Sequence, residues 1–196
     1  MMSVIMPAGS PSARERMIRS AALLVRERGI EATSFSDVLA ASGAPRGSIY
    51  HHFPAGKSQL IAEATEWSGS TIATGLERAL AGGDPVAAMH AFIATWRGVL
   101  ADSDFDAGCP VVAASVESAA NPGAREAAAA AFNAWNDALA EALERAGADT
   151  DRAKSLATLI VAAVEGAIVQ CRALRSLDPL DRVEAELTAT VAGATG

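Results

Sequence analysis

The side chains best suited to hold an anion gather in one short stretch near the N-terminus, SGAPRGSIYHHF, at residues 42–53. Arg46 can bind guanine through two hydrogen bonds or hold a phosphate. The hydroxyl of Tyr50 can reach a phosphate while its ring packs. His51 and His52 are adjacent, so on a helix they point ~100° apart and cannot both ligate one zinc ion. The stretch is therefore a candidate contact for nucleic acid, with a solvated helix corner as the alternative.

Two helices are predicted before the centre of this stretch. Apolar residues recur at steps of three and four from Ser12 onward, which predicts an amphipathic helix that ends at Gly29. A second, short helix ends at Gly43, where glycine suits the end of a helix. The residues that can cap its start through a side-chain oxygen are Thr33, Ser34 and Ser36.

A third helix is predicted at about Pro45–His51, because proline suits the first position of a helix. Ile49 and Phe53 are four residues apart and would anchor it inward. Two short helices joined at a glycine turn form the helix-turn-helix pattern, whose second helix lies in the major groove of DNA. Side chains at the start of that helix would face the bases, and a glycine there lets the backbone approach a phosphate. These residues are Arg46, Gly47 and Ser48.

The charge of the chain is distributed unevenly. The 196 residues carry a net charge of −7, yet residues 1–57 hold seven basic and four acidic side chains, which leaves +3. The remainder holds nine basic and nineteen acidic side chains, which leaves −10. A small basic part on a large acidic body favours an anionic partner that meets only the N-terminal part. Arginines on a solvated helix are the alternative explanation.

The rest of the chain also has helical periodicity, so we predict an all-α protein of about nine helices. Residues 1–11 are expected to be a disordered lead-in, 12–60 the helix-turn-helix DNA-binding domain, and 61–196 a larger helical domain for ligand binding and dimerisation. Neither repeats nor a credible strand are apparent in the sequence. The later helices are predicted at about residues 57–80, 85–100, 110–120, 124–146, 151–175 and 180–191.

The sequence also predicts the compartment. Two cysteines provide no disulfide framework, which favours a reducing cytoplasm. The N-terminus has no basic region followed by an apolar segment, as a secretory signal would. The longest apolar stretch, LATLIVAAV, is interrupted by Glu165 and is shorter than the ~20 residues that span a bilayer. We therefore expect no membrane partner.

No catalytic motif stands out, so we expect a binding protein rather than an enzyme, with no cofactor and no metal site. The larger domain instead carries an aromatic set that either fills its core or lines a ligand cavity. Cys109 is either a small packing residue or a thiolate at a helix start. Glu165, His90 and Gln170 are the polar side chains that could fix a ligand. The predicted ligand-binding residues are Phe92, Trp96, Phe105, Cys109, Phe132, Trp135 and Glu165.

The segment RGIEATSFSDVLAASGAPRGSIYHHFPAGKSQL, residues 28–60, resembles the tetracycline-repressor (TetR) family of transcriptional regulators. Two positions depart from the family pattern: three residues instead of two separate Phe53 from Lys57, and Ala44 stands where valine is usual. Further along, GCPVVAASVES and LIVAAVEGAIVQCRAL resemble the LmrA/YxaF-like branch. With this resemblance, the predicted DNA-binding set is Thr33, Ser34, Pro45, Arg46, Gly47, Ser48, Tyr50, His51, His52 and Lys57.

The resemblance implies a homodimeric repressor that leaves a palindromic operator on double-stranded DNA when a small effector binds. The apolar and aromatic composition favours a hydrophobic or aromatic effector. The last two helices would form the dimer interface, with the expected contact face made of Ala157, Ile160, Val161, Val164 and Ile168. The alternative is a helical small-molecule-binding protein or enzyme that uses the cavity of the larger domain and has lost DNA binding.

Overall fold

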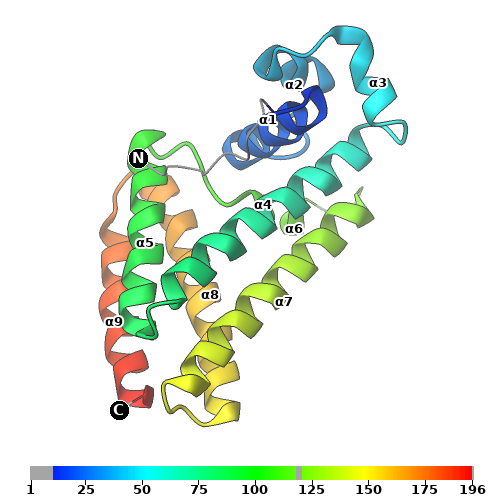
Figure 1. The fold of residues 1–196 in the computed structure, drawn as a ribbon. Coiled ribbons are helices and arrows are strands. Elements are labelled where there is room, and N and C mark those ends of the chain that lie inside the picture. Colours follow the sequence, from blue (N-terminus) through cyan, green and yellow to red (C-terminus); the bar gives the residue numbers. More distant parts are fainter. Residues whose placement is uncertain (1–10, 118–120, 196) are drawn as a thin grey trace.

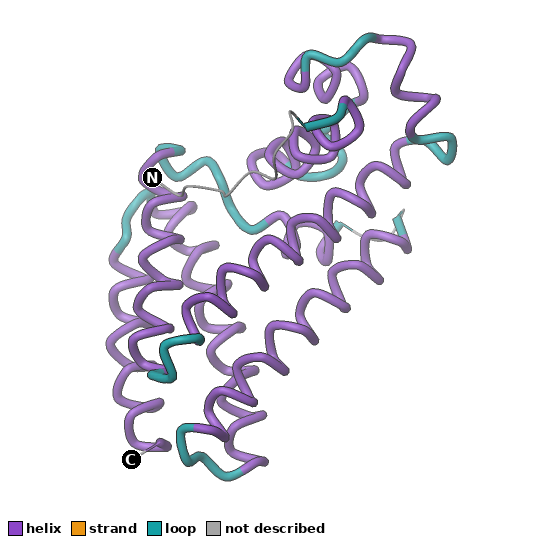
Figure 2. The backbone as a smooth tube through the Cα atoms, viewed as in Figure 1, coloured by secondary structure: helices purple, strands orange, loops and turns teal. Residues whose placement is uncertain are grey.

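The computed structural model describes residues 11–117 and 121–195, with the side chain at position 46 left out. Over these residues the chain forms nine α-helices and one short 3-10 turn, and it contains no strand (Figures 1 and 2). The all-α prediction is therefore confirmed. The elements are α1 (Ala13–Arg28), α2 (Phe35–Ser42), η1 (Arg46–Ser48), α3 (Ile49–His52), α4 (Lys57–Leu80), α5 (Pro85–Asp102), α6 (Pro110–Val116), α7 (Pro122–Arg145), α8 (Thr150–Leu174) and α9 (Asp178–Thr195).

Helices α1 to α3 form a small unit with its own core at one end of the molecule (Figure 1). Ser12 caps α1, and its hydroxyl and the Glu15 carboxylate accept hydrogen bonds from each other's backbone N–H groups. Ser34 and Asp37 form the same reciprocal box at the start of α2. Of the three predicted caps, Ser34 is thus the one used. These boxes satisfy N–H groups that a helix start leaves free.

The turn between α2 and the third helix is made by Gly43, which has a left-handed backbone with a φ of 63°. Glycine adopts this conformation without strain. The third helix differs from its prediction, because Pro45 precedes it in an extended conformation and it begins with the 3-10 turn η1 before one turn of α3. Ile49 and Phe53 are buried, as predicted for the residues that anchor it.

The long helix α4 joins the small unit to the larger domain. Figure 1 shows α4 running diagonally from the end of α3 into the larger domain, where it lies beside α7. Leu60 and Ala64, near its start, pack in the core of the small unit, whereas Leu76 and Leu80, near its end, pack in the main core. A single helix therefore belongs to both parts, so any tilt of α4 moves the small unit relative to the rest.

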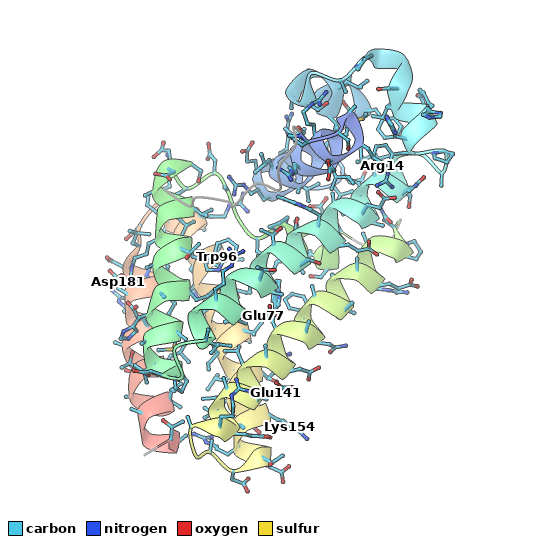
Figure 3. The ribbon with its side chains drawn as sticks, in the orientation of Figure 1. Arg14, Glu77, Trp96, Glu141, Lys154 and Asp181 are labelled. Atoms are coloured by element: carbon cyan, nitrogen blue, oxygen red, sulfur yellow. The ribbon has the colours of Figure 1, made fainter. Side chains whose placement is uncertain are left out.

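The larger domain is built by α4, α5, α7, α8 and α9, with α6 next to the small unit. Arg97 of α5 fixes α9, because its guanidinium donates to Asp181 at 2.6 Å and also pairs with Glu184. Asp181 is labelled on the outer edge of α9 in Figure 3. Helix α8 is capped by Asp149, whose side chain accepts hydrogen bonds from the backbone N–H groups of Asp151 and Arg152.

Helix α8 bears on two predictions about the C-terminal part, and it corrects the second. The helix has 25 residues, and the mean hydropathy of its most apolar 18-residue window is 1.6, which is sufficient by length and composition to cross a membrane. However, core helices pass the same test, and α8 packs against α7 and α9. The expected dimer face was also misplaced, because four of its five residues point into the chain's own core. These residues are Ala157, Ile160, Val164 and Ile168.

Candidate DNA-contacting surface and ligand cavity

The third helix presents a free outer surface. Tyr50 is 69% exposed, and its ring meets the edge of Phe35 with centroids 5.6 Å apart. That contact supports the ring from α2 while leaving the Tyr50 side chain largely in solvent. A side chain at Gly47 would have nothing within 4 Å, so the backbone there is open to a partner. The side chain of Arg46 lies outside the described residues.

Several hydroxyls of the predicted set are already engaged within the fold. Thr33 is buried, and its hydroxyl donates to the carbonyl of Gly29 at 2.8 Å, so it is not available to a phosphate. Ser34 serves as the cap of α2 and donates to Asp37 at 2.6 Å. Ser48 donates to the carbonyl of Pro45 at 2.6 Å. Of these three, Ser34 and Ser48 keep part of their surface in solvent, whereas Thr33 has a structural role.

Lys57 opens α4 despite the extra residue before it. The chain turns between Phe53 and Gly56, whose N–H donates to the Phe53 carbonyl at 2.9 Å. The ammonium group of Lys57 donates to the carbonyl of Glu31 at 3.3 Å, which ties the start of α4 to the loop after α1. The longer turn is thus absorbed without moving Lys57 away from the first turn of the helix.

Much of the positive charge of the N-terminal part serves the fold. Arg14 pairs with Glu63 at 2.5 Å and lies near the start of α4 (Figure 3). Arg16 donates to two backbone carbonyls, and Arg28 lies 3.8 Å from Asp37. The net charge of +3 is therefore a weaker indication of DNA binding than the exposed third helix.

The larger domain contains an almost wholly apolar cavity between α4, α5, α7 and α8. The cavity has about 400 Å³ of space, part of it open to solvent, and room for the centre of a water molecule amounts to only about 20 Å³. A drug-sized ligand would thus have to widen it. The lining residues are Leu76, Met89, Phe92, Trp135, Leu139, Ile160, Val161, Val164 and Glu165.

Some of the predicted ligand-binding residues line this apolar cavity, and others pack behind its lining. Phe92, Trp135 and Glu165 line the cavity. Trp96, Phe105 and Phe132 do not, because they pack into the core around it. Trp96 is buried on the inner side of α5 (Figure 3) and meets Phe92 edge to face, and Phe132 meets Trp135 in the same way.

The other polar candidates, His90 and Gln170, are exposed. His90 bonds to the hydroxyl of Thr188 at 2.8 Å, between α5 and α9. Neither side chain lines the apolar cavity. Both side chains lie on the outer surface of the helical domain.

Glu165 lies between the cavity and a second, wider cleft. The cleft has about 810 Å³ of space, open in part to solvent, and separates the end of α1 from α6 and α8. Burial raises the pKa of Glu165 to about 7, while a hydrogen bond with the Cys109 thiol acts in the opposite direction. The pKa of Cys109 is raised by its own burial and by the charge of Glu165, so the thiolate predicted as an alternative is disfavoured.

The cleft also contains the contacts that hold the small unit to the larger domain. Arg172 of α8 donates to the backbone carbonyls of Glu27 at 3.1 Å and Asp106 at 2.8 Å. The N–H of Gly108 donates to the carbonyl of Arg26 at 2.8 Å. A side chain at Gly108 would come within 2.7 Å of the Arg172 guanidinium, so it would displace that group from its present position.

Glu117, which ends α6, completes this attachment. Its carboxylate accepts hydrogen bonds from the backbone N–H groups of Ile30 at 2.8 Å and Glu31 at 3.1 Å. A side chain at Gly29 would lie 2.3 Å from the same carboxylate. We call Gly108, Glu117 and Arg172 the α1 clamp.

Sequence reasoning missed the α1 clamp. Its contacts span 66 to 145 residues along the chain, or involve a backbone group that any residue offers. The only local signal is the pair of glycines, Gly29 and Gly108, and each of them also fits a simple turn. The clamp therefore becomes visible only when α1, α6 and α8 are placed together.

Comparison with known proteins assigns both parts of the chain. Residues 17–64 match the family described as bacterial regulatory proteins, tetR family, and residues 85–186 match the C-terminal domain of LmrA/YxaF-like transcriptional regulators. An uncharacterized HTH-type transcriptional regulator of Mycobacterium tuberculosis (strain H37Rv) is 45% identical over 89% of this chain and 91% of its own length. The chain belongs to the TetR family. It is a TetR-family transcriptional regulator, in agreement with the prediction.

Other TetR-family proteins agree with this placement. The HTH-type transcriptional regulator LmrA of Bacillus subtilis is 31% identical over 85% of this chain and 90% of its own length. The crystal structure of a regulatory protein TetR from Rhodobacter sphaeroides superposes with a TM-score of 0.82 at 24% identity, covering 91% of this chain and 98% of that one. The latter likeness concerns the fold. TetR-family regulators bind operator DNA and dimerise.

Proposed function

We propose that this TetR-family protein is a repressor that a small hydrophobic or aromatic effector releases from a palindromic operator. The observation that carries the proposal is the third helix, whose buried Ile49 and Phe53 leave Tyr50 and Gly47 facing outward. In a helix-turn-helix this surface enters the major groove. Arg46 would read a base, and Tyr50 and Lys57 would hold phosphates.

The dimer would form through α8 and α9, using a face different from the one predicted from the sequence. Leu159 and Val169 are 47% and 53% exposed, and Ala162, Gly166 and Ala173 lie on the same side of α8 at helical spacing. The exposed alanines of α9 follow the same spacing: Ala185, Ala189 and Ala192. Small residues let helices approach closely, and a two-fold axis would bring each face onto its copy.

The route from effector to DNA would pass through the α1 clamp. A ligand that widens the apolar cavity displaces α8 or α4, which wall it. Helix α8 carries Arg172, which holds the end of α1, and α4 continues into the core of the small unit. The effector would favour a spacing of the third helices of the two protomers that no longer matches successive major grooves. The size of the loss in operator affinity is set by the difference in effector affinity between the two arrangements.

The proposal also places the protein in the cytoplasm, where its operator would be accessible. Fluorescence anisotropy with a duplex from upstream of its own gene tests DNA binding, with a scrambled duplex of equal length as the control. We expect salt-dependent binding that is at least a hundredfold tighter for the upstream duplex. Equal, weak binding to both duplexes would instead favour a helical small-molecule-binding protein that has lost DNA binding.

A further inference from the structure

We propose that the effector carries a positively charged group, such as an ammonium, on its hydrophobic or aromatic body, and that Glu165 binds this group. The inference rests on the proposed function only in taking the apolar cavity as the effector site. Its observations are the position of Glu165 between two cavities and the absence, among the described residues, of a bonding partner for one of its carboxylate oxygens.

The first observation is geometric. Glu165 is the one charged residue among the described residues that line the apolar cavity. The same side chain also lines the wider cleft beside Cys109. A ligand with an apolar body in the cavity would therefore end at Glu165, and the cleft behind it provides room for a polar head and for water.

The second observation is that no described residue serves as a counterion to Glu165. Its Oε2 atom is buried and accepts no hydrogen bond from the described part of the chain. The charged residues facing it across the cleft are engaged elsewhere or carry the same sign. Arg172 donates to backbone carbonyls, and Arg28 lies near Asp37. Glu27 and Glu117 are acidic.

These observations favour a cation over a neutral or an anionic ligand. A buried carboxylate oxygen without a partner is costly, and a cation at hydrogen-bond distance removes that cost while keeping the group ionised. A neutral alcohol would donate a weaker bond. An anion would be repelled by Glu165 and would have to use Arg172, whose buried Nε also lacks a partner among the described residues.

The affinity for a cation should therefore depend on pH. The pKa of Glu165, raised to about 7 by burial, means that the free protein is partly protonated there. A cation binds the ionised form, so its affinity should rise with pH below about 7 and level off above it. Cys109 does not interfere, because its thiol has a pKa raised well above the usual value.

Three probes of matched shape test the inference on the whole protein: naphthylmethylamine, naphthylmethanol and naphthylacetate. Calorimetry at pH 8 would give their affinities, and quenching of tryptophan fluorescence would report binding near Trp135. We expect the amine to bind at least tenfold more tightly than the alcohol, and its affinity to fall at least fivefold between pH 8 and pH 6.

The matched variants are Glu165→Gln and Glu141→Gln. Glu141 lies on the outer surface of α7 (Figure 3), so its replacement removes the same charge from outside the cavity. In Glu165→Gln the preference for the amine over the alcohol should shrink to within threefold, and in Glu141→Gln it should persist. The pH dependence of the affinity for the amine is measured on the wild-type protein alone. It therefore tests the inference even if Glu165→Gln does not fold.

Three results would overturn the inference: equal affinity for amine and alcohol in the wild-type protein, an amine preference that survives in Glu165→Gln, or tightest binding of naphthylacetate. Tightest binding of naphthylacetate would indicate an anionic effector whose charged group binds Arg172. Binding of the upstream duplex by the ligand-free wild-type protein is measured separately. A failure of the proposed function would appear as a lack of binding to that duplex, whereas the relative affinities of the three probes test only the role of Glu165.

Discussion

The DNA-contacting unit and the effector domain use polar groups in opposite ways. In the unit formed by α1 to α3, hydroxyls and carboxylates are engaged by near neighbours, as in the Ser34–Asp37 box, and the side chains free for a partner are exposed, as Tyr50 is. In the larger domain the decisive group, Glu165, is half-buried, and its buried Oε2 atom has no hydrogen-bond partner among the described residues. One part is thus ready for its ligand, whereas the other must rearrange to receive one.

This contrast explains why the two sites respond to different experiments. Surface contacts can be removed one at a time with little effect on the fold, because they are made only in the complex. A buried polar group affects folding, pH dependence and ligand affinity together, since all three depend on its charge state. The predictions below separate these effects and run from the largest expected effect to the smallest.

The largest effect should come from the proposed dimer face on α8. Ala162→Arg places a charge at the centre of the exposed stripe, and we expect a monomer at micromolar concentration and a loss of at least a hundredfold in operator affinity. Ala134→Arg, on the exposed side of α7, is the control and should remain dimeric. Light scattering distinguishes them. If the Ala162→Arg protein remained dimeric, the dimer interface would lie elsewhere than on this face.

The second effect concerns the pH dependence of folding. The pKa of Glu165 is raised from 4.5 to about 7, so the neutral form stabilises the fold below pH 4.5, and this contribution is lost as the pH rises through 7. Relative to Glu165→Gln, the free energy of unfolding of the wild-type protein should fall by ~2–3 kcal/mol between pH 5 and pH 9. Urea unfolding of both proteins at the two pH values checks this. A constant difference would mean that Glu165 stays solvated.

The third effect concerns base reading by the small unit. Arg46→Ala should weaken operator binding by ~1–3 kcal/mol and relax the preference at one base pair in each half-site. Titration of operator duplexes with single substitutions provides the measurement. Arg14→Ala is a useful comparison, because Arg14 pairs with Glu63 within the fold and its loss should affect stability more than sequence preference. If Arg46→Ala bound the operator as tightly as the wild type, the third helix would not be the element that contacts the bases.

The smallest effect should come from the phosphate contact. Tyr50→Phe keeps the ring against Phe35 and removes only the hydroxyl, so binding should weaken by ~0.5–1.5 kcal/mol for every sequence alike. Unfolding should be unaffected, since the hydroxyl is outside the core. If Tyr50→Phe altered the preference between operator variants, the residue would contact a base instead.

The contrast between the DNA-contacting unit and the effector domain also determined what could be predicted from the sequence. The all-α fold and the positions of most helices follow from periodicity and from caps such as Ser12, Ser34 and Gly43, which act within a few residues. The length of the third helix did not follow, because Pro45 and Gly47 fit both a continuous helix and the observed 3-10 start. The burial of Thr33 could not be predicted, because it depends on the return of the chain after α1.

The effector domain was less predictable for a physical reason. An aromatic residue on an apolar helix face has the same local pattern whether it lines a cavity, as Trp135 does, or packs behind it, as Trp96 does. The dimer face suffered from the same ambiguity. The inner stripe of α8 at Ile160 and Val164 is more apolar than the outer one at Ala162 and Gly166, and composition alone favoured the wrong side.

The most direct test of the whole account is the coupling between the two regions. The affinity for operator DNA would be measured with and without a saturating aromatic ligand, chosen by its quenching of tryptophan fluorescence. The proteins would be the wild type, Arg172→Met, and Arg145→Met as a surface control. We predict that the ligand weakens operator binding at least tenfold in the wild type and in Arg145→Met, and less than threefold when the α1 clamp lacks Arg172. Operator affinity that a saturating ligand leaves unchanged in the wild-type protein would contradict the account.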